Sequence, residues 1–444
     1  MHLTPPQLDA AIVAMRTVLP LQYPADAIMR RFFRENPMLG GQDRAFIAET
    51  VFGILRHRFF LESLTNGITP RALVLAYLAK FQGMNLRELA PLVSETESKW
   101  LAEIKGSKPD ALPLAIQAEL PEWVVEKLQH GMPDSDILDL GLSLQQPAPL
   151  DLRVNTILAK RAEVLETLAQ EGIEAQATPY SPCGIRLIGK PAINRHALFL
   201  SGKIEVQDEG SQLLGYLLAP KRGEMVVDFC AGAGGKSLLL GALMNSKGRL
   251  YAFDVSEKRL SNLKPRFKRS GLSNLHTQRI ADENDSKIKR LSGKIDRVLV
   301  DAPCSGLGTL RRNPDLKWRQ SAQSIEELKA KQAAILSAAA GLLKPGGRLV
   351  YATCSFLPEE NQAVIGDFLA THPQFTVLNC AELLSQQKIP LDTGEFLQLS
   401  PRLHQTDGFF AAALTRAETA EITETAKAAK TDHKPEPVSE TEVV

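Results

Sequence analysis

The sequence has 444 residues, of which 44% are hydrophobic and 23% charged, and its formal net charge is +1. This length predicts two or three domains, and the composition is that of an ordinary globular protein. The chain contains no run of about 18 apolar residues, and its first residues show no charged segment leading into an apolar one, so we expect neither a membrane span nor a secretory signal.

The first 140 residues have the apolar spacing of helices. Residues 43–64, for example, repeat apolar side chains at helical intervals around a basic insert, Arg56-His57-Arg58. We interpret the insert as a solvated helix face, with RNA contact as the alternative. The predicted helices of this region span residues 8–18, 43–64, 71–81, 86–92 and 122–130.

Residues 145–220 mix short strand patterns with one helix, which predicts a small α+β subdomain. The strands are expected at 150–155, 185–188 and 203–206, and the helix at 161–170. A further helix follows, for which Asp208 and Ser211 are the candidate N-caps.

From residue 221 the pattern becomes strand, loop and helix in repetition, which is typical of a doubly wound α/β fold with ligands at the carboxyl ends of its strands. The expected strands are 225–229, 249–253, 275–280, 296–300, 347–352 and 408–414. The expected helices are 236–244, 257–269, 324–343 and 358–370.

Residues 417–444 hold seven acidic residues and three lysines, which gives them a charge of −4 and leaves +5 for the remainder. With almost nothing to bury, this tail is predicted to be disordered. The mildly basic remainder is compatible with nucleic-acid binding without being diagnostic of it.

The five cysteines are Cys183, Cys230, Cys304, Cys354 and Cys380, and none forms a C-x-x-C pair. We therefore expect free thiols in the reducing cytoplasm and no metal site.

A glycine-rich loop, D-F-C-A-G-A-G-G-K-S at residues 228–237, follows the first strand of the α/β region. It is not a phosphate-binding P-loop, because Cys230 stands where that motif needs glycine. A dinucleotide fingerprint needs glycine or alanine at position 237, where serine stands. The loop of class I methyltransferases remains, with Gly232 and Gly234 letting the backbone approach S-adenosyl-L-methionine. The alternative is a glycine-rich turn that only permits close packing.

Carboxylates follow the next two predicted strands. Asp254 is expected to bind the ribose hydroxyls of the cofactor, the role of the acidic residue that follows the second strand in nucleotide-binding folds. Asp282 is the candidate contact for the adenine amine, and Asp285 competes with it for this role.

Two thiols also stand at predicted strand ends, Cys304 in D-A-P-C-S and Cys354 in Y-A-T-C-S. Methylation of cytosine at carbon 5 requires a thiolate that adds to carbon 6, a hydrogen donor at ring N3 and a base that removes the carbon-5 proton. The two thiols meet these needs together with Asp301, which is a candidate N3 donor if it is protonated. The alternative is that both cysteines are small packing residues.

Four stretches resemble the Nol/Nop/Sun family of RNA cytosine-C5 methyltransferases, and within it the bacterial RsmB-type enzymes of small-subunit ribosomal RNA. They are D-F-C-A-G-A-G-G-K, D-A-P-C-S-G-L-G-T-L-R-R-N-P-D-L-K-W, L-K-P-G-G-R-L-V-Y-A-T-C-S-F-L-P-E-E-N and D-G-F-F. The likeness is dense over 205–414 and thinner over 150–205. In the first 140 residues, G-Q-D-R-A-F-I-A-E-T-V-F-G-I-L-R is similar to the NusB-like RNA-binding domain of such enzymes.

The resemblance implies an α/β, Rossmann-like methyltransferase domain at 221–416, after a NusB-like helical domain at 1–140 and the small subdomain at 145–220. It implies that Cys354 is the nucleophile, that Cys304 assists release of the product and that Asp301 contacts the base and the cofactor. The implied S-adenosyl-L-methionine contacts are Cys230, Ala231, Gly232, Ala233, Gly234, Gly235, Lys236, Asp254, Asp282 and Asp301. Gly232 and Ala233 depart from the Ala and Pro of the usual family loop.

The resemblance also suggests RNA contacts just after Cys304. Arg311, Arg312 and Lys317 are expected to contact phosphates and Trp318 to stack on a base, with plain surface or core positions as the alternatives. The expected partner is RNA, in particular 16S ribosomal RNA, bound by a monomer without metal. Two other functions stay open: a DNA cytosine-C5 methyltransferase, which would use Cys304 as its nucleophile, and a non-catalytic RNA-binding assembly factor.

Overall fold

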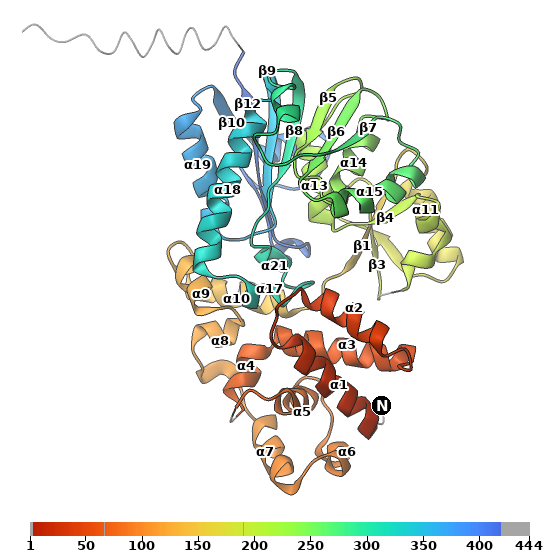
Figure 1. The fold of residues 1–444 in the computed structure, drawn as a ribbon, viewed down its shortest axis with the longest axis vertical. Coiled ribbons are helices and arrows are strands. Elements are labelled where there is room, and N and C mark those ends of the chain that lie inside the picture. The colour runs from red at the N-terminus through yellow and green to blue at the C-terminus, as the bar shows by residue number, and fades with distance from the viewer. Residues whose placement is uncertain (1–2, 66, 190, 419–444) are drawn as a thin grey trace, which may run out of the picture.

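The computed structural model describes residues 3–65, 67–189 and 191–418. Its first part is helical and lies below the α/β domain in Figure 1. The helices of this part are α1 (Pro5–Val18), α2 (Ala25–Glu35), α3 (Gly41–Arg56), α4 (Arg58–Ser63), α5 (Pro70–Lys80), α6 (Leu86–Leu89), α7 (Glu95–Lys105), α8 (Leu114–Ala118), α9 (Glu122–Gln129) and α10 (Asp134–Gln145), with 3-10 turns at Ala90–Leu92 and Pro109–Ala111.

Two separate cores hold these helices. Residues of α1 to α7 form one apolar cluster that stays within residues 3–104. The apolar side chains of α8 to α10 instead share a cluster with Leu307, Leu310 and Leu357 of the α/β domain. The last helices of the predicted helical domain therefore pack against the α/β domain through their own hydrophobic contacts.

The single helix predicted over residues 43–64 is wrong, because the structure divides it at His57 into α3 and α4. The backbone amides of Phe59 and Phe60 open α4, and both donate to the carboxylate of Glu119, at 3.1 and 2.8 Å. The carboxylate accepts hydrogen bonds from N–H groups that have no partner within the first turn of a helix. This contact therefore stabilises the start of a second helix, whereas the apolar pattern of the sequence predicts that the first helix continues.

The small subdomain is a four-stranded antiparallel sheet in the order β2-β3-β1-β4. Its elements are β1 (Leu150–Val154), α11 (Arg161–Gln170), β2 (Ala175–Ala177), β3 (Gly184–Leu187), the 3-10 turn Ile193–Arg195, α12 (Ala197–Leu200) and β4 (Ile204–Val206). The predicted α+β character is confirmed, and Asp208 is the N-cap of the next helix, since its side chain accepts from the amide of Gly210.

The large sheet has eight strands, in the order β10-β12-β9-β8-β5-β6-β7 with β11 beside β12. Strands β5 to β9 are parallel, and β12 is antiparallel to β9. The strands are β5 (Met225–Asp228), β6 (Arg249–Asp254), β7 (Leu275–Arg279), β8 (Ile295–Asp301), β9 (Leu343–Thr353), β10 (Phe375–Leu378), β11 (Leu397–Leu399) and β12 (Phe409–Arg416).

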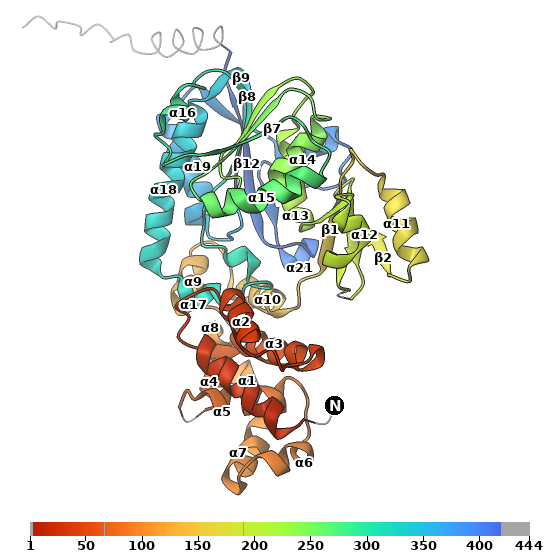
Figure 2. The same cartoon turned by 45° about the vertical axis from the view of Figure 1, so that its right-hand side comes forward.

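Alternation of side chains along the strands builds a core on each face of this sheet. In β8, Leu299 faces one cluster, whereas Val298 and Val300 face the other. Helices α13, α14, α15 and α20 contribute to the first cluster, and α16, α18 and α19 to the second. Figures 1 and 2 show α18 and α19 along one side of the sheet.

The helices of this domain are α13 (Glu209–Leu218), α14 (Gly235–Leu243), α15 (Glu257–Arg269), α16 (Ser286–Lys289), α17 (Leu316–Arg319), α18 (Ala322–Ala340), α19 (Gln362–Thr371), α20 (Cys380–Gln386) and α21 (Pro401–His404), with 3-10 turns at Leu307–Thr309 and Pro358–Glu360. The predicted α/β, Rossmann-like class is confirmed. The domain boundaries stay a prediction, and most of the tail predicted to be disordered, residues 419–444, lies outside the described residues. Among the helices of the described ranges, none has the length and apolarity to cross a membrane.

Candidate active site

The glycine-rich loop links β5 to α14 at the carboxyl edge of the sheet. Gly234 precedes α14 with φ +80°, and a Cβ atom there would lie 2.0 Å from Cδ1 of Leu263. Gly232 has φ +56°, and nothing lies within 4 Å of the position of its missing Cβ. Gly234 therefore satisfies backbone and packing demands, while Gly232 leaves open space beside the loop, as close approach of a ligand requires.

Asp254 ends β6 and faces this loop. Its two carboxylate oxygens accept from the backbone amides of Gly232 and Ser256, at 2.8 and 2.7 Å. Each oxygen has a second lone pair, so Asp254 keeps acceptor capacity for two hydroxyl groups. These residues fit the ribose of S-adenosylmethionine.

Asp282 and Asp285 differ in how their oxygens are used. Both oxygens of Asp285 accept backbone amides, from Lys287 at 2.9 Å and from Ala281 at 2.8 Å, and these bonds lower the pKa of Asp285. Asp282 is exposed and accepts one amide, that of Asn284, through Oδ1. Asp285 thus shapes the loop and begins α16, which favours Asp282 as the adenine contact.

Lys236 and Asp301 form an ion pair between α14 and the end of β8. Lys236 Nζ lies 2.7 Å from Oδ2 of Asp301, and 5.7 Å from the ring centre of Phe409. Burial lowers the pKa of Lys236, but the attraction of Asp301 outweighs it and raises that pKa overall. Lys236 therefore stays an ammonium group beside Asp301.

The two thiols meet where β8 and β9 end. These strands are paired in parallel, with Asp301 opposite Ala352, so both loops leave the sheet at the same edge. The sulfur atoms of Cys304 and Cys354 lie 3.3 Å apart, and the amide of Cys354 also donates to Cys304 Sγ at 3.3 Å. The hydrogen bond with Cys354 and burial raise the pKa of Cys304 well above its usual value.

Burial also raises the pKa of two acidic groups at the cofactor loop, Asp228 and Cys230. Burial raises the pKa of Asp228 to about 7, although its Oδ2 accepts the hydroxyl of Ser237 at 2.6 Å. Its Oδ1 has no partner among the described residues. Burial likewise raises the pKa of Cys230, which therefore stays a neutral thiol under the loop. Asp228 is not among the site residues predicted from the sequence. Its position at the end of the first strand, directly before the glycine-rich loop, is the feature of the sequence that could have indicated it.

Arg311 and Arg312 do not lie on a free surface. Arg311 is 5% exposed and pairs with Asp407 at 3.2 Å. Arg312 pairs with Asp407 at 2.5 Å and with Asp208 at 2.9 Å. Arg311 thus joins the Cys304 loop to the segment before β12, and Arg312 joins it to that segment and to the small subdomain. The expected phosphate contact is corrected for the buried Arg311, whereas Arg312 stays 30% exposed and its phosphate contact remains a prediction.

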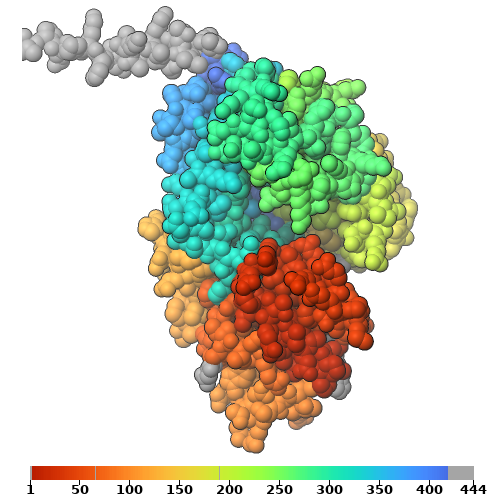
Figure 3. Space-filling view, viewed as in Figure 1, coloured from red at the N-terminus to blue at the C-terminus, as the bar shows by residue number. Residues whose placement is uncertain are grey.

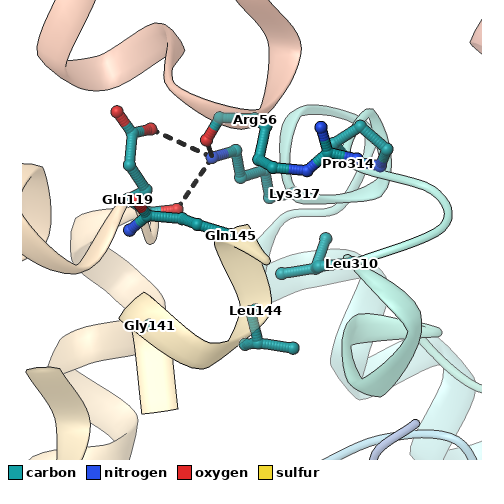
Figure 4. A pocket seen from close by; sticks show the side chains of 8 residues that line it. All are labelled: Arg56, Glu119, Gly141, Leu144, Gln145, Leu310, Pro314 and Lys317. Atoms are coloured by element: carbon teal, nitrogen blue, oxygen red, sulfur yellow. Dashed lines mark hydrogen bonds and ion pairs between the residues drawn. The ribbon is translucent and has the colours of Figure 1, made fainter. Parts of the chain in front are cut away.

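Lys317 lies in the junction with the helical part (Figure 4), and Trp318 contacts Phe59 of the same part. Lys317 is 4% exposed and donates to the backbone oxygens of Arg56 and Glu119 and to the Glu119 carboxylate, at 3.0, 2.9 and 3.0 Å. These bonds use all three protons of its ammonium group, so the expected phosphate contact of Lys317 is wrong. Trp318 stacks on Phe59, with ring centres 4.0 Å apart, instead of presenting a free face.

The basic insert of the helical part belongs to the same junction. Arg56 donates to the backbone oxygen of Arg311 at 3.1 Å, and the guanidinium of Arg58 lies 4.4 Å from the ring centre of Trp318. The ring of His57 stacks on Phe81 at 4.0 Å. Neither a solvated face nor an RNA patch describes this insert, since it holds the segment that follows Cys304. Figure 3 shows a hollow between the red N-terminal helices and the green part of the α/β domain.

In the described ranges, no group of three or more His, Cys, Asp or Glu side chains is arranged to hold a metal ion. The strand order, the glycine loop with Asp254 and the thiols at the carboxyl edge define a Rossmann-like methyltransferase that uses S-adenosylmethionine.

Comparison with known proteins identifies the family. Residues 215–415 match the family model for 16S rRNA methyltransferase RsmB/F, and residues 120–194 match that of the RsmF/B-like ferredoxin-like domain. A probable ribosomal RNA small subunit methyltransferase B of a Synechocystis species is 31% identical over 426 residues, which cover 88% of this chain and 95% of that protein. The protein of the same description from Bacillus subtilis is 29% identical and covers 92% of this chain and 98% of its own. The crystal structure of PH0851 covers 94% of this chain and 100% of its own, with 29% identity and a TM-score of 0.76. The chain belongs to the RsmB/F methyltransferase family.

Proposed function

We propose that this protein methylates carbon 5 of a cytosine in RNA, in particular in small-subunit ribosomal RNA, through a covalent bond between Cys354 and carbon 6. The observation that carries the proposal is the 3.3 Å separation of the Cys304 and Cys354 sulfur atoms beside the Lys236–Asp301 pair. The relatives from Synechocystis and Bacillus subtilis are described as probable small-subunit ribosomal RNA methyltransferases, which supports this substrate. A cytoplasmic location, a monomeric state and 16S ribosomal RNA as the particular partner stay predictions.

The hydrogen bond between the thiols supports different roles for them. Cys304 holds its proton tightly, because its pKa is raised by the contact with Cys354 and by burial. A proton on Cys304 can be donated to the Cys354 sulfur, which favours Cys354 as the thiolate of the pair. Cys354 then attacks carbon 6 and makes carbon 5 nucleophilic.

Charge that develops on the cytosine ring needs a donor at N3. The Lys236 ammonium beside Asp301 supplies a positive group at this point of the site, so Asp301 need not be protonated. We assign to Asp301 the amino edge of the base and to Lys236 the compensation of charge near N3.

Cys304 is the base that removes the carbon-5 proton in this proposal. S-adenosylmethionine supplies the methyl group, and carbon 5 of the adduct then carries both that group and a proton. Bonding of Cys354 to carbon 6 removes the sulfur charge and the hydrogen bond that held the proton on Cys304, so Cys304 then releases this proton to water. Its thiolate then takes the carbon-5 proton, and the bond from carbon 6 to Cys354 breaks, which restores the Cys354 thiolate. One proton reaches solvent in each turnover.

Two alternatives predict different results. A DNA enzyme of this kind would attack with Cys304, the thiol whose raised pKa makes it the poorer thiolate of the pair. A non-catalytic RNA-binding factor has no use for two thiols within hydrogen-bonding distance.

Transfer of a labelled methyl group from S-adenosylmethionine tests the proposal. Deproteinised small-subunit ribosomal RNA is the acceptor, a duplex DNA is the comparison, and the labelled nucleoside is identified after digestion. We expect 5-methylcytidine from RNA and no label in DNA. Label on another nucleoside, label in DNA or no transfer to RNA would each overturn the proposal.

A further inference from the structure

A buried carboxylate lies between the two thiol loops and takes no part in the reaction described above. Glu360 ends the 3-10 turn Pro358–Glu360 and is 0% exposed. A carboxylate this deep requires a full set of hydrogen-bond partners, and the identity of those partners indicates what it does.

The first partner is the residue next to Cys304. The backbone amide of Ser305 donates to Glu360 Oε1 at 2.8 Å, and the hydroxyl of Ser305 donates to Oε2 at 2.5 Å. Both oxygens of Glu360 are therefore bonded to one residue of the Cys304 loop, which fixes its position and its orientation.

The second partner comes from α18. The amide nitrogen of Gln332 donates to Glu360 Oε1 at 3.0 Å and to the backbone oxygen of Pro303 at 3.0 Å. The residues on both sides of Cys304 are thus held by Glu360 and its partner. Every group that contacts the carboxylate in these bonds is a donor, as the ionised form of a carboxyl group requires.

The same segment also holds the Cys354 loop. The hydroxyl of Tyr351 donates to the backbone oxygen of Glu360 at 2.7 Å. The next side chain, Asn361, accepts from the hydroxyl of Thr353 at 2.5 Å and donates to the backbone oxygen of Ser355 at 3.0 Å. Residues on both sides of Cys354 are therefore bonded to Asn361.

We infer that Glu360 is a positioning residue that fixes the distance between the two thiols and, through its negative charge, keeps the proton of the pair on Cys304. This inference rests on the proposed function for its catalytic consequence. The negative charge of Glu360 adds to the hydrogen bond with Cys354 and to burial in raising the pKa of Cys304. Glu360 thereby favours Cys354 as the nucleophile without contacting the substrate.

Alkylation of Cys304 tests the electrostatic part without RNA or methyl donor, so its result does not depend on the proposed function. Iodoacetamide modification of Cys304 is followed between pH 7 and 9 by mass spectrometry of its peptide, in a Cys354→Ala background. Glu360→Gln keeps the size of the side chain and removes its charge. Because one pKa unit changes the thiolate fraction tenfold, we expect about 3- to 10-fold faster alkylation in Glu360→Gln.

The neighbouring Glu359 gives a matched control, because it points away to Lys127, with a 2.8 Å ion pair. Glu359→Gln in the same background is expected to leave the alkylation rate unchanged. Equal rates in the Glu360→Gln and Glu359→Gln variants would overturn the electrostatic role.

Glu360→Asp, with both cysteines intact, separates geometry from charge. It keeps the charge, but it is one methylene shorter and cannot reach the amide and the hydroxyl of Ser305 together. We expect it to lose at least about tenfold in methyl transfer, the loss typical of small misplacements in a site, while Cys304 alkylation in the Cys354→Ala background stays unchanged. Full methyl transfer by Glu360→Asp would overturn the positioning role, and this variant decides the inference if Glu360→Gln does not fold.

Discussion

The sulfur atoms of Cys304 and Cys354 lie 3.3 Å apart although fifty positions separate the two residues in the chain. The parallel pairing of β8 with β9 produces this meeting, because it ends both strands at one edge of the sheet. The Lys236–Asp301 pair lies at the same edge, since Asp301 is the last residue of β8. The site therefore brings two thiols, a carboxylate and an ammonium group together at one edge of the sheet.

Asp254→Ala is predicted to weaken binding of S-adenosylmethionine. Loss of two hydrogen bonds to a charged acceptor, at about 1.5 kcal/mol each, corresponds to roughly a hundredfold in affinity. Calorimetric titration with S-adenosylhomocysteine measures the change. Glu257→Ala, an exposed acid three residues away, is the control and is expected to bind normally. An unchanged affinity in Asp254→Ala would contradict the assigned ribose contact.

Asp282→Asn and Asp285→Asn are predicted to behave differently. Asp282→Asn loses the carboxylate oxygen that we propose accepts from the adenine amine, and it is expected to weaken binding by about tenfold, the cost of one hydrogen bond. Asp285→Asn loses one of its two amide contacts and is expected to lower thermal stability more than affinity. Thermal unfolding and the same titration measure both variants. The reverse ranking of affinities would assign the adenine contact to Asp285.

Lys317→Met is predicted to lower the free energy of unfolding by about 3 kcal/mol, because it leaves the buried Glu119 carboxylate without its cation. Urea denaturation measures the loss. Lys99→Met breaks an exposed ion pair, with side chains 74% and 85% exposed, and is expected to cost less than about 1 kcal/mol. Similar costs for the two variants would show that the junction does not depend on the Lys317–Glu119 pair.

His57→Phe is predicted to make the protein less sensitive to acid. Burial lowers the pKa of His57 to about 3, and the nearby charges of Lys317 and Arg56 add to this. Below pH 6.5 the unfolded chain binds a proton at this histidine, whereas the folded chain does not. The free energy of unfolding therefore falls as the pH drops from 6.5 towards 3. Phenylalanine keeps the stacking on Phe81 and removes the proton site.

The measurement is urea stability at pH 7.5, 6.0 and 5.0. The wild-type protein is expected to lose up to about 1.4 kcal/mol per pH unit more than His57→Phe below pH 6.5. His130→Phe replaces an exposed histidine and is expected to keep the wild-type slope. Parallel curves for wild type and His57→Phe would refute a neutral His57 in the folded chain.

The sequence predicted six of the eight strands of the large sheet, because most of these are short apolar runs followed by glycines, carboxylates or thiols, and it missed β10 and β11. Asp301 and Cys304 could be placed at a strand end on this ground alone, and so could Cys354. Parallel strands then bring their carboxyl ends together, which is why the candidate site was predictable before its distances were known.

The junction between the parts was not predictable, because its residues have partners far away in the chain. Glu119 accepts from the first amides of α4 although it lies 59 positions from Phe60, and Asp407 binds Arg311 across 96 positions. A lysine or arginine in a loop is usually exposed, so Lys317 and Arg311 were expected to face RNA. Helix α2 was also not predicted, because charged residues interrupt its apolar pattern, although Met29 and Phe32 lie on its buried face.

Trapping of RNA by the cysteine variants tests the central claim most directly. Cys304→Ala and Cys354→Ala proteins are incubated with RNA and S-adenosylmethionine and then resolved under denaturing conditions. If Cys354 forms the bond to carbon 6 and Cys304 is needed to break it, Cys304→Ala accumulates an RNA–protein adduct and Cys354→Ala forms none. An adduct with Cys354→Ala and none with Cys304→Ala would contradict this assignment and make Cys304 the nucleophile.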